Sequence, residues 1–371
     1  MPVEIKVAPP GITISQGRTF MVTDERGEIA PNCDEGVFAI DTRFISGYRV
    51  SVNGQPWTLL TASQISFYAA RIDFTNPVLP GETAAVPANT IGLTIDRTVG
   101  EGIHEDFTLT NYSGKLVRLV LELTLQADFA DIFEAKARRF IQRGRLHTNW
   151  GQEQRALHIR YTHDDFHRAM VYQIPACGAT SSVGFANGRI FWDVELQPGQ
   201  DWQTCGEIIL EYGQQIKKSV YGHRTLPAPL AQEGDTPPRG AEPRSDFDER
   251  QARWQAHCTA VETPNEHVYR MYRQAVEDMG ALRIYDLDVS DEAWVPAAGV
   301  PWFVTLFGRD SLLVSLQNMS VAPGFARGAL QRLAEYQAQE RDDWRDAQPG
   351  KILHEIRFGE LAHFHTIPFT P

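Results

Sequence analysis

Cysteines are few in this sequence, and long hydrophobic runs are absent. The four cysteines among 371 residues are scattered without a CxxC pair, so neither a zinc site nor a disulfide framework is expected. We expect free, buried thiols at all four positions. No apolar run approaches the roughly 18 residues of a membrane span, and the start lacks a basic segment followed by an apolar one. We therefore expect a cytoplasmic protein without metal or other cofactor. The cysteines are Cys33, Cys177, Cys205 and Cys258.

Positive charge is also in deficit. There are 35 Lys and Arg residues against 47 Asp and Glu, which gives a formal net charge of -12. Nucleic acid and anionic membrane both require a basic surface, so we expect neither as a partner. A neutral polysaccharide remains compatible with this charge. The length is typical of two or three domains.

The first 222 residues carry the hydrophobic pattern of strands. Apolar and polar residues alternate from Val117 to Gln126, so one face of that strand is predicted to be buried and the other wet. Alternation also precedes Asn53-Gly54, a pair typical of a two-residue hairpin turn. Further strands are predicted at 91–97, 103–110, 190–196 and 205–212. Many short strands separated by turns predict an antiparallel β-sandwich over residues 1–222.

The pattern changes after a proline-rich stretch. Residues 223–245 hold five prolines between glycines and charges, which predicts a linker. From 246 to 371 the apolar period is 3.6, and helices are predicted at 247–257, 264–282, 310–319 and 323–336. We expect a capping box from Thr263 to Glu266, with Pro264 at the first helical position. The stripe of the second helix is expected to pack in the core; it comprises Val268, Met271, Tyr272, Ala275, Met279 and Leu282.

One stretch of this helical half combines aromatic and charged residues. It runs from 297 to 319 and reads AAGVPWFVTLFGRDSLLVSLQNM. Asp310 stands just before an apolar-periodic segment, where an N-cap is expected. In a second interpretation, Arg309 and Asp310 bind sugar hydroxyls while Trp302 or Phe307 stacks on the sugar ring. Spacing alone leaves both interpretations open.

Two groups of titratable residues in the sandwich half have a structural interpretation. Asp128, Asp131 and Glu134 follow a strand, and their spacing is typical of a short helical turn with acidic residues at its start. His163 and His167 bracket two acids, which would suit a metal only on a helix. Because the surrounding pattern is extended, we expect a solvated turn there and no metal site.

The last stretch, 341–371, is polar and has no helical stripe. A loop of this length in a compact domain is usually functional or disordered. His354 and Glu355 are a candidate acid/base pair, although their spacing does not show that they face one point. Arg345 and Arg357 flank them.

Four stretches together resemble a known family. GVPWFVTLFGRDSLL is similar to the opening of the catalytic barrel in glycogen-debranching-type proteins, the amylo-α-1,6-glucosidase-like glycosidases. The other three stretches are FAIDTRFISGYRVSVNG (38–54), ADFADIFEAK (127–136) and DDWRDAQPGKILHEIRFGEL (342–361). The resemblance implies a β-sandwich followed by an (α/α)6 barrel, with α-glucan as substrate and hydrolysis of α-1,6 or related bonds with inversion.

The resemblance also assigns residues. It favours substrate contacts for Trp302, Phe307, Arg309, Asp310, Arg345, His354, Glu355 and Arg357. In the family the acid and base carboxylates come from the middle and late parts of the barrel, so we assign no catalytic residue and expect an incomplete barrel. The apolar helix faces should then be covered by the missing barrel or by another copy of the chain. A non-catalytic glucan-binding or interaction module remains the alternative function.

Overall fold

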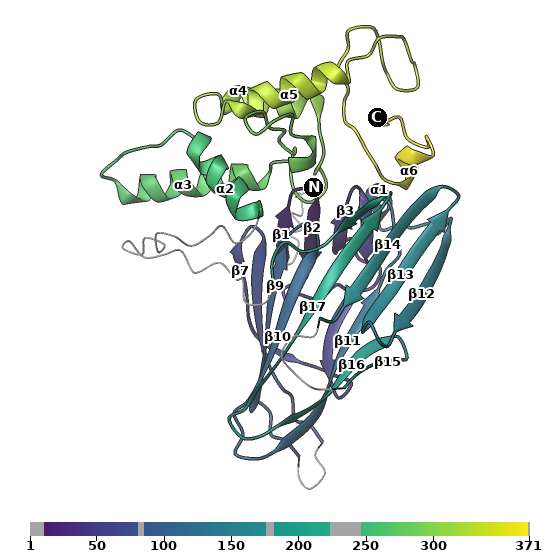
Figure 1. The fold of residues 1–371 in the computed structure, drawn as a ribbon, viewed down its shortest axis with the longest axis vertical. Coiled ribbons are helices and arrows are strands. Elements are labelled where there is room, and N and C mark those ends of the chain that lie inside the picture. Colours follow the sequence, from purple (N-terminus) through teal and green to yellow (C-terminus); the bar gives the residue numbers. More distant parts are fainter. Residues whose placement is uncertain (1–10, 81–84, 176–181, 223–245, 370–371) are drawn as a thin grey trace, which may run out of the picture.

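The computed structural model describes residues 11–80, 85–175, 182–222 and 246–369. Within these residues all strands pair antiparallel, in three sheets (Figure 1). The largest sheet has the order β12-β13-β14-β17-β10-β9-β8-β7, with β18 paired to β17. Its strands are β7 (Thr58–Ser66), β8 (Ala69–Thr75), β9 (Ile91–Val99), β10 (Ile103–Asn111), β12 (Arg145–Gly151), β13 (Ala156–His163), β14 (Phe166–Gln173), β17 (Asp201–Tyr212) and β18 (Gln215–Lys217).

Two smaller sheets complete the β part. One has the order β15-β16-β11-β5-β6 and the other β1-β2-β3-β4. Their strands are β1 (Ile12–Gln16), β2 (Thr19–Thr23), β3 (Gly36–Ala39), β4 (Thr42–Ile45), β5 (Gly47–Val52), β6 (Gln55–Pro56), β11 (Val117–Gln126), β15 (Val183–Ala186) and β16 (Arg189–Leu196). The predicted antiparallel β-sandwich is confirmed.

The alternation read in the sequence explains the sandwich core. Along β11 every second side chain, beginning with Val117, is buried, because that face packs against the larger sheet. Phe107 of the larger sheet lies 6.3 Å from Trp192 of β16, centroid to centroid. Asn53 and Gly54 have φ values of 48° and 75°, the left-handed backbone that the predicted two-residue turn requires.

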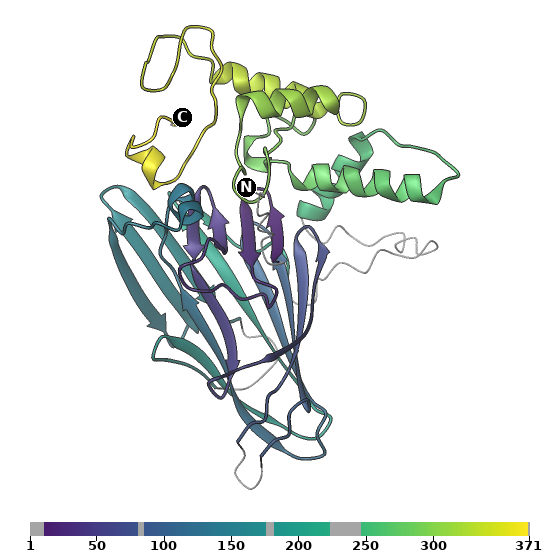
Figure 2. The ribbon, with the colours of Figure 1, turned by 180° about the vertical axis from the view of Figure 1, so that it is seen from behind.

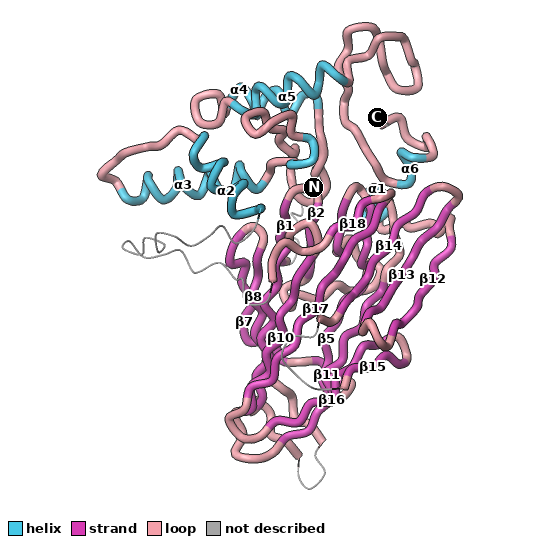
Figure 3. The backbone as a smooth tube through the Cα atoms, in the orientation of Figure 1, coloured by secondary structure: helices cyan, strands magenta, loops and turns pink. Residues whose placement is uncertain are grey.

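The helices gather over one end of the sandwich (Figures 1 and 2). In sequence order the helical elements are α1 (Ile132–Ala137), α2 (Asp246–His257), α3 (Glu266–Ala281), the 3-10 turn η1 (Tyr285–Leu287), α4 (Gly308–Gln317), α5 (Gly324–Glu335) and α6 (Glu360–His363). Between α5 and α6 the chain is a long loop (Figure 3). A sandwich followed by a few helices is the predicted fold class. The expected linker 223–245 lies outside the described residues.

Two predicted helix starts were wrong. The cap of α3 is Asn265, whose Oδ1 accepts from the N–H groups of His267 and Val268, so Pro264 stands before the helix. Helix α4 begins at Gly308 and its N-cap is Phe307. Asp310 is therefore in the first turn and is not the cap.

The apolar stripes of the helices have different surroundings. Phe325, Ala329 and Leu333 of α5 are buried, as the apolar period of 3.6 in its sequence requires. The stripe of α3 packs only in part: Tyr272 and Met279 lie against a small core cluster, whereas Val268 is 48% exposed and Met271 73% exposed. The corresponding face of α4 is also open to solvent in the described chain; its exposed residues are Leu313, Leu316 and nearby Met319.

The expectation of four free thiols was wrong for one cysteine. Cys205 is disulfide-bonded, whereas Cys33 and Cys258 are free and half-buried. Burial raises the pKa of each free thiol to about 11, so both stay protonated and unreactive near neutral pH. Cys177 lies outside the described residues. Among the described helices, none is long and apolar enough to cross a membrane.

Candidate functional site

The four stretches that carry the family resemblance meet at one end of the sandwich, around the guanidinium of Arg357. This side chain is 2% exposed. Its Nε donates to Glu355 Oε2 at 2.6 Å and its Nη1 to Asp41 Oδ1 at 2.8 Å. Its Nη2 donates to the main-chain oxygen of Trp302 at 3.2 Å. Arg357 therefore joins a turn of the sandwich to two segments of the helical half.

A strained hairpin turn presents Asp41 to this arginine. Ile40 and Asp41 connect β3 to β4 with φ values of 47° and 56°, and a β-branched residue such as Ile40 rarely adopts positive φ. The second oxygen of Asp41 accepts from the N–H of Phe358 at 2.9 Å. Strain of this kind persists where surrounding contacts hold it, often at functional sites.

Main-chain pairing brings two of the predicted segments side by side. Phe307 and Glu355 form an antiparallel bridge, and the N–H of Gly308 donates to the carbonyl of His354 at 3.0 Å. Thr305 Oγ1 donates to the carbonyl of Ile356 at 2.7 Å. The extended pairing ends at Gly308, which explains why α4 begins there and not at Asp310.

A hollow of about 880 Å³ opens beside this pairing. Arg345, His354 and Glu355 of the predicted residues line it, together with Tyr336 and Phe369. Carboxylates and amides from the end of α5 and the loop after it also line the hollow, and they comprise Glu335, Gln337, Gln339, Glu340, Asp342, Asp343 and Asp346. Its size and its mixture of rings with hydrogen-bonding groups are typical of a pocket for a polar organic ligand.

The other predicted residues lie outside the hollow's lining. Trp302 packs against an apolar cluster of the helical half, and the ring of buried Phe307 lies 5.4 Å from the Arg357 guanidinium. Arg309 and Asp310 form an ion pair with each other, Nη2 to Oδ2, at 3.5 Å. The Arg309 side chain is 75% exposed. Arg357 is buried by its own partners. The predicted residues thus fall into three groups: those that line the hollow, the packed residues Trp302, Phe307 and Arg357, and the surface pair Arg309 and Asp310.

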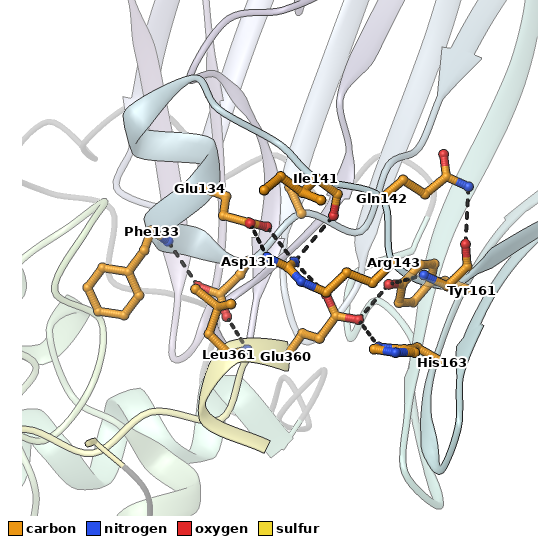
Figure 4. Close-up of polar contacts among 12 residues, drawn as sticks. Asp131, Phe133, Glu134, Ile141, Gln142, Arg143, Tyr161, His163, Glu360 and Leu361 are labelled. Atoms are coloured by element: carbon orange, nitrogen blue, oxygen red, sulfur yellow. Dashed lines mark hydrogen bonds and ion pairs between the residues drawn. The ribbon is translucent and has the colours of Figure 1, made fainter. Parts of the chain in front are cut away.

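A second polar network, shown in Figure 4, ties the start of α6 to the sandwich. Glu360 is buried and its Oε1 accepts from Tyr161 Oη at 2.5 Å and contacts His163 Nδ1 at 2.8 Å. Arg143 bridges Glu360 to Glu134 of α1, with its closest contact to Glu134 at 2.6 Å. His163 stands next to a hairpin turn, as predicted, but it is bound to Glu360 and is not a freely solvated side chain.

Asp131 caps α1 and also receives the C-terminal segment. Its Oδ1 accepts from the N–H of Phe133 and its Oδ2 from the N–H of Leu361, each at 3.0 Å. Burial raises the pKa of Asp131 to about 7, against the lowering effect of these two hydrogen bonds. The predicted helical start at Asp131 is confirmed, while its contact with Leu361 could not be read from spacing.

One group of potential metal ligands is found among the described residues, inside the sandwich. It consists of His104, Asp106 and Cys205. The sulfur of Cys205 is already in a disulfide, so this group does not present the thiolate that a metal would need.

The sequence interpretation missed parts of the site. Tyr336 and Phe369 both line the hollow, and the sequence interpretation assigned neither of them to the site; Tyr336 also packs against the apolar cluster under the helices. Trp344 is 59% exposed beside the lining residues Asp343 and Arg345. The sequence contained no signal for this placement, because a tryptophan in a polar loop does not show by itself whether its ring is exposed, and single exposed apolar side chains are common.

Comparison with known proteins gives a family and a fold. A family profile described as the N-terminal domain of (some) glycogen debranching enzymes matches residues 14–207. A candidate kojibiose phosphorylase from human microbiome aligns with 88% of this chain and 47% of its own, at 8% identity and a TM-score of 0.53. A candidate aldose 1-epimerase from Escherichia coli K12 aligns with 55% of this chain and 99% of its own, at 8% identity and a TM-score of 0.32.

No curated protein matches the chain. The chain spans about half the length of the phosphorylase structure. At this identity the likeness is one of fold.

We predict that Arg357→Met destabilises the protein by roughly 3–5 kcal/mol, because it leaves two buried carboxylates without their cation. Urea unfolding measures the loss. Arg341→Met is the matched control: its ion pair with Asp343 has side chains 73% and 80% exposed, so the change should cost less than about 1 kcal/mol. Equal losses of stability from the two substitutions would contradict the claim that the ion cluster of Arg357 stabilises the fold.

Asp131 predicts a pH dependence of stability. Its pKa is about 7 in the folded chain and near 3.8 when free, so the folded state holds an extra proton between these values. The stability that this group contributes is present below about pH 4 and is lost as pH rises through about 7. The free energy of unfolding of wild type, minus that of Asp131→Asn, should fall between about pH 4 and pH 7 and level off above that. Parallel pH curves for the two proteins would exclude this titration.

Proposed function

We propose that this chain, which belongs to the family of the N-terminal domain of (some) glycogen debranching enzymes, is the glucan-binding part of a glycoside hydrolase. The substrate class is an α-linked glucan, and the bond is α-1,6 or a related α-glucosidic bond cleaved with inversion. The observation that carries the proposal is the hollow beside the Arg357 cluster. The stretch 342–361, which resembles the family, supplies much of its lining, and two further resembling stretches contact Arg357 through Asp41 and Trp302.

The chemistry of the hollow suits a neutral sugar. His354 is exposed at its surface, with its ring centroid 5.9 Å from those of both Phe307 and Phe369. Sugar hydroxyls accept and donate hydrogen bonds to such polar groups, while the C–H face of the ring lies on an aromatic face. We assign Arg345 and His354 as the polar contacts and Phe369 as the aromatic one.

Glu355 has a different role in this proposal. Nε and Nη2 of Arg357 each lie 2.6 Å from Glu355 Oε2, so its charge is already compensated. A general acid must arrive protonated, and a general base must be free to take a proton from water. Glu355 therefore holds the wall of the hollow in place through its contact with Arg357. We propose that the two carboxylates that inversion requires lie outside the residues of the hollow.

The alternative is a non-catalytic glucan-binding or interaction module. The exposed apolar faces of α3 and α4, with Met271 73% and Leu316 67% exposed, favour a contact with further protein. Hydrolysis distinguishes the two functions. If the chain is part of a glycoside hydrolase, a protein that holds both the hollow and the two carboxylates should hydrolyse the glucan. If the chain is a binding module, no further protein joined to it should produce hydrolysis.

Binding of maltohexaose, measured by titration calorimetry on the 371-residue chain, tests the proposal. Arg345→Ala and His354→Ala should each weaken binding about threefold to tenfold, the loss expected for one hydrogen bond. Arg270→Ala, on the exposed surface of α3, is the matched control and should bind as wild type does.

Unchanged affinity in both hollow variants would remove the hollow from substrate binding. In a parallel assay the chain should release no reducing sugar from a branched dextrin. Turnover that disappears in Glu355→Gln would show that the catalytic carboxylate had been misassigned.

A further inference from the structure

A separate cavity lies where the sandwich meets the segment around α6. Its volume is about 470 Å³, and its lining contains two arginines, two histidines and a tyrosine, without an acidic residue. These residues are Arg168, Tyr212, Arg357, His363 and His365. A cavity with this lining is unexpected in a protein whose formal net charge is -12.

Arg168 lines this cavity and forms no ion pair with a carboxylate among the residues that the structure describes. It lies on β14 opposite Tyr212 of β17. Its Nη1 donates to the carbonyl of His167 and its Nη2 to that of Phe358, each at 3.0 Å, and its Nε is buried without an acceptor. Two of the five N–H groups of the guanidinium are thus used by these bonds. Burial lowers the pKa of Arg168 to about 10, which reflects the cost of a desolvated charge.

The neighbouring carboxylates are bound to other groups. Asp41 accepts from Arg357 and from the N–H of Phe358. Glu360 is bound by Tyr161, His163 and Arg143, as described above. Asp165 Oδ1 lies 2.9 Å from Nε2 of His363. These acids lower the positive potential of the cavity, but none forms an ion pair with Arg168.

A second arginine near the cavity also has unused donors. The guanidinium of Arg18 lies 4.5 Å from the ring centroid of Phe358, a lining residue. Nε and Nη2 of Arg18 are buried without a hydrogen bond, although Nε lies 3.2 Å from Asp286. Three buried guanidinium nitrogens, two on Arg18 and one on Arg168, therefore make no hydrogen bond, and both arginines contact Phe358. Buried donors in this state usually indicate a bound water or ion.

We propose that this cavity binds a tetrahedral oxyanion, either inorganic phosphate or the phosphate group of a sugar phosphate. Guanidinium groups present several N–H donors in a plane that matches two oxygens of a phosphate. Arg168 provides the charge, and Tyr212 and His365 provide further donors at the wall. The cavity is larger than a single ion, and it falls in the size range of small-molecule pockets, so a sugar attached to the phosphate can be accommodated. The site is distinct from the glucan hollow and does not depend on the proposed function.

Titration calorimetry of the full chain with inorganic phosphate, with glucose 1-phosphate and with chloride at matched ionic strength tests this site. Phosphate and glucose 1-phosphate should bind, and chloride should not. Arg168→Gln should weaken binding at least about tenfold, since a charge-assisted contact is lost. It should still fold, because the substitution removes a buried charge without orphaning a carboxylate.

A second variant does not depend on Arg168. His365 is exposed and has a φ of 51°, a conformation that asparagine tolerates, so His365→Asn should fold normally and weaken binding about threefold. His267→Gln, on the exposed part of α3, should have no effect. Tighter binding of glucose 1-phosphate would identify a sugar phosphate, and equal binding would identify the inorganic ion. No binding of either, or equal binding by wild type and Arg168→Gln, would overturn the proposal.

Discussion

The ion cluster of Arg357 with Asp41 and Glu355 is the interaction on which this structure depends. Three charges are buried together, and such a group is stable only while each partner keeps its position. The cluster fixes a strained turn of the sandwich, the strand-like pairing of residues 305–308 with 354–356, and the wall of the hollow. Asp131 and Glu360 add contacts between the sandwich and the segment that follows Arg357. The sandwich therefore supplies residues that hold the site in place.

Much of the fold could be predicted because its causes are local. The alternation from Val117 to Gln126 requires one buried face, and the pair Asn53-Gly54 requires a left-handed turn. The apolar period of 3.6 located α2, α3, α4 and α5 within a few residues. The exact starts of α3 and α4 could not be predicted. Gly308 begins its helix because Phe307 pairs with Glu355, a tertiary contact that spacing does not contain.

The candidate site was predicted only in part, for a similar reason. Arg345, His354 and Glu355 lie together because they share one loop. Asp41 and Arg357 are 316 residues apart, and no local pattern links a turn residue to an arginine at that distance. Arg309 and Asp310 fitted a sugar contact in sequence, yet they lie on the helix surface outside the hollow. Buried partners and surface pairs look alike in a sequence because both consist of the same charged residue types.

The most direct test of this account is the affinity of Asp41→Asn for maltohexaose. Asp41 does not line the hollow, and asparagine tolerates its left-handed backbone, so any effect on binding must pass through the two groups that Asp41 holds, the Arg357 guanidinium and the N–H of Phe358. The account predicts at least about threefold weaker binding in a protein that still unfolds cooperatively. Asp96→Asn, which removes a surface ion pair with Arg71 on the sandwich, should bind as wild type does. Wild-type affinity in a folded Asp41→Asn protein would contradict the claim that the sandwich holds the hollow in its binding shape.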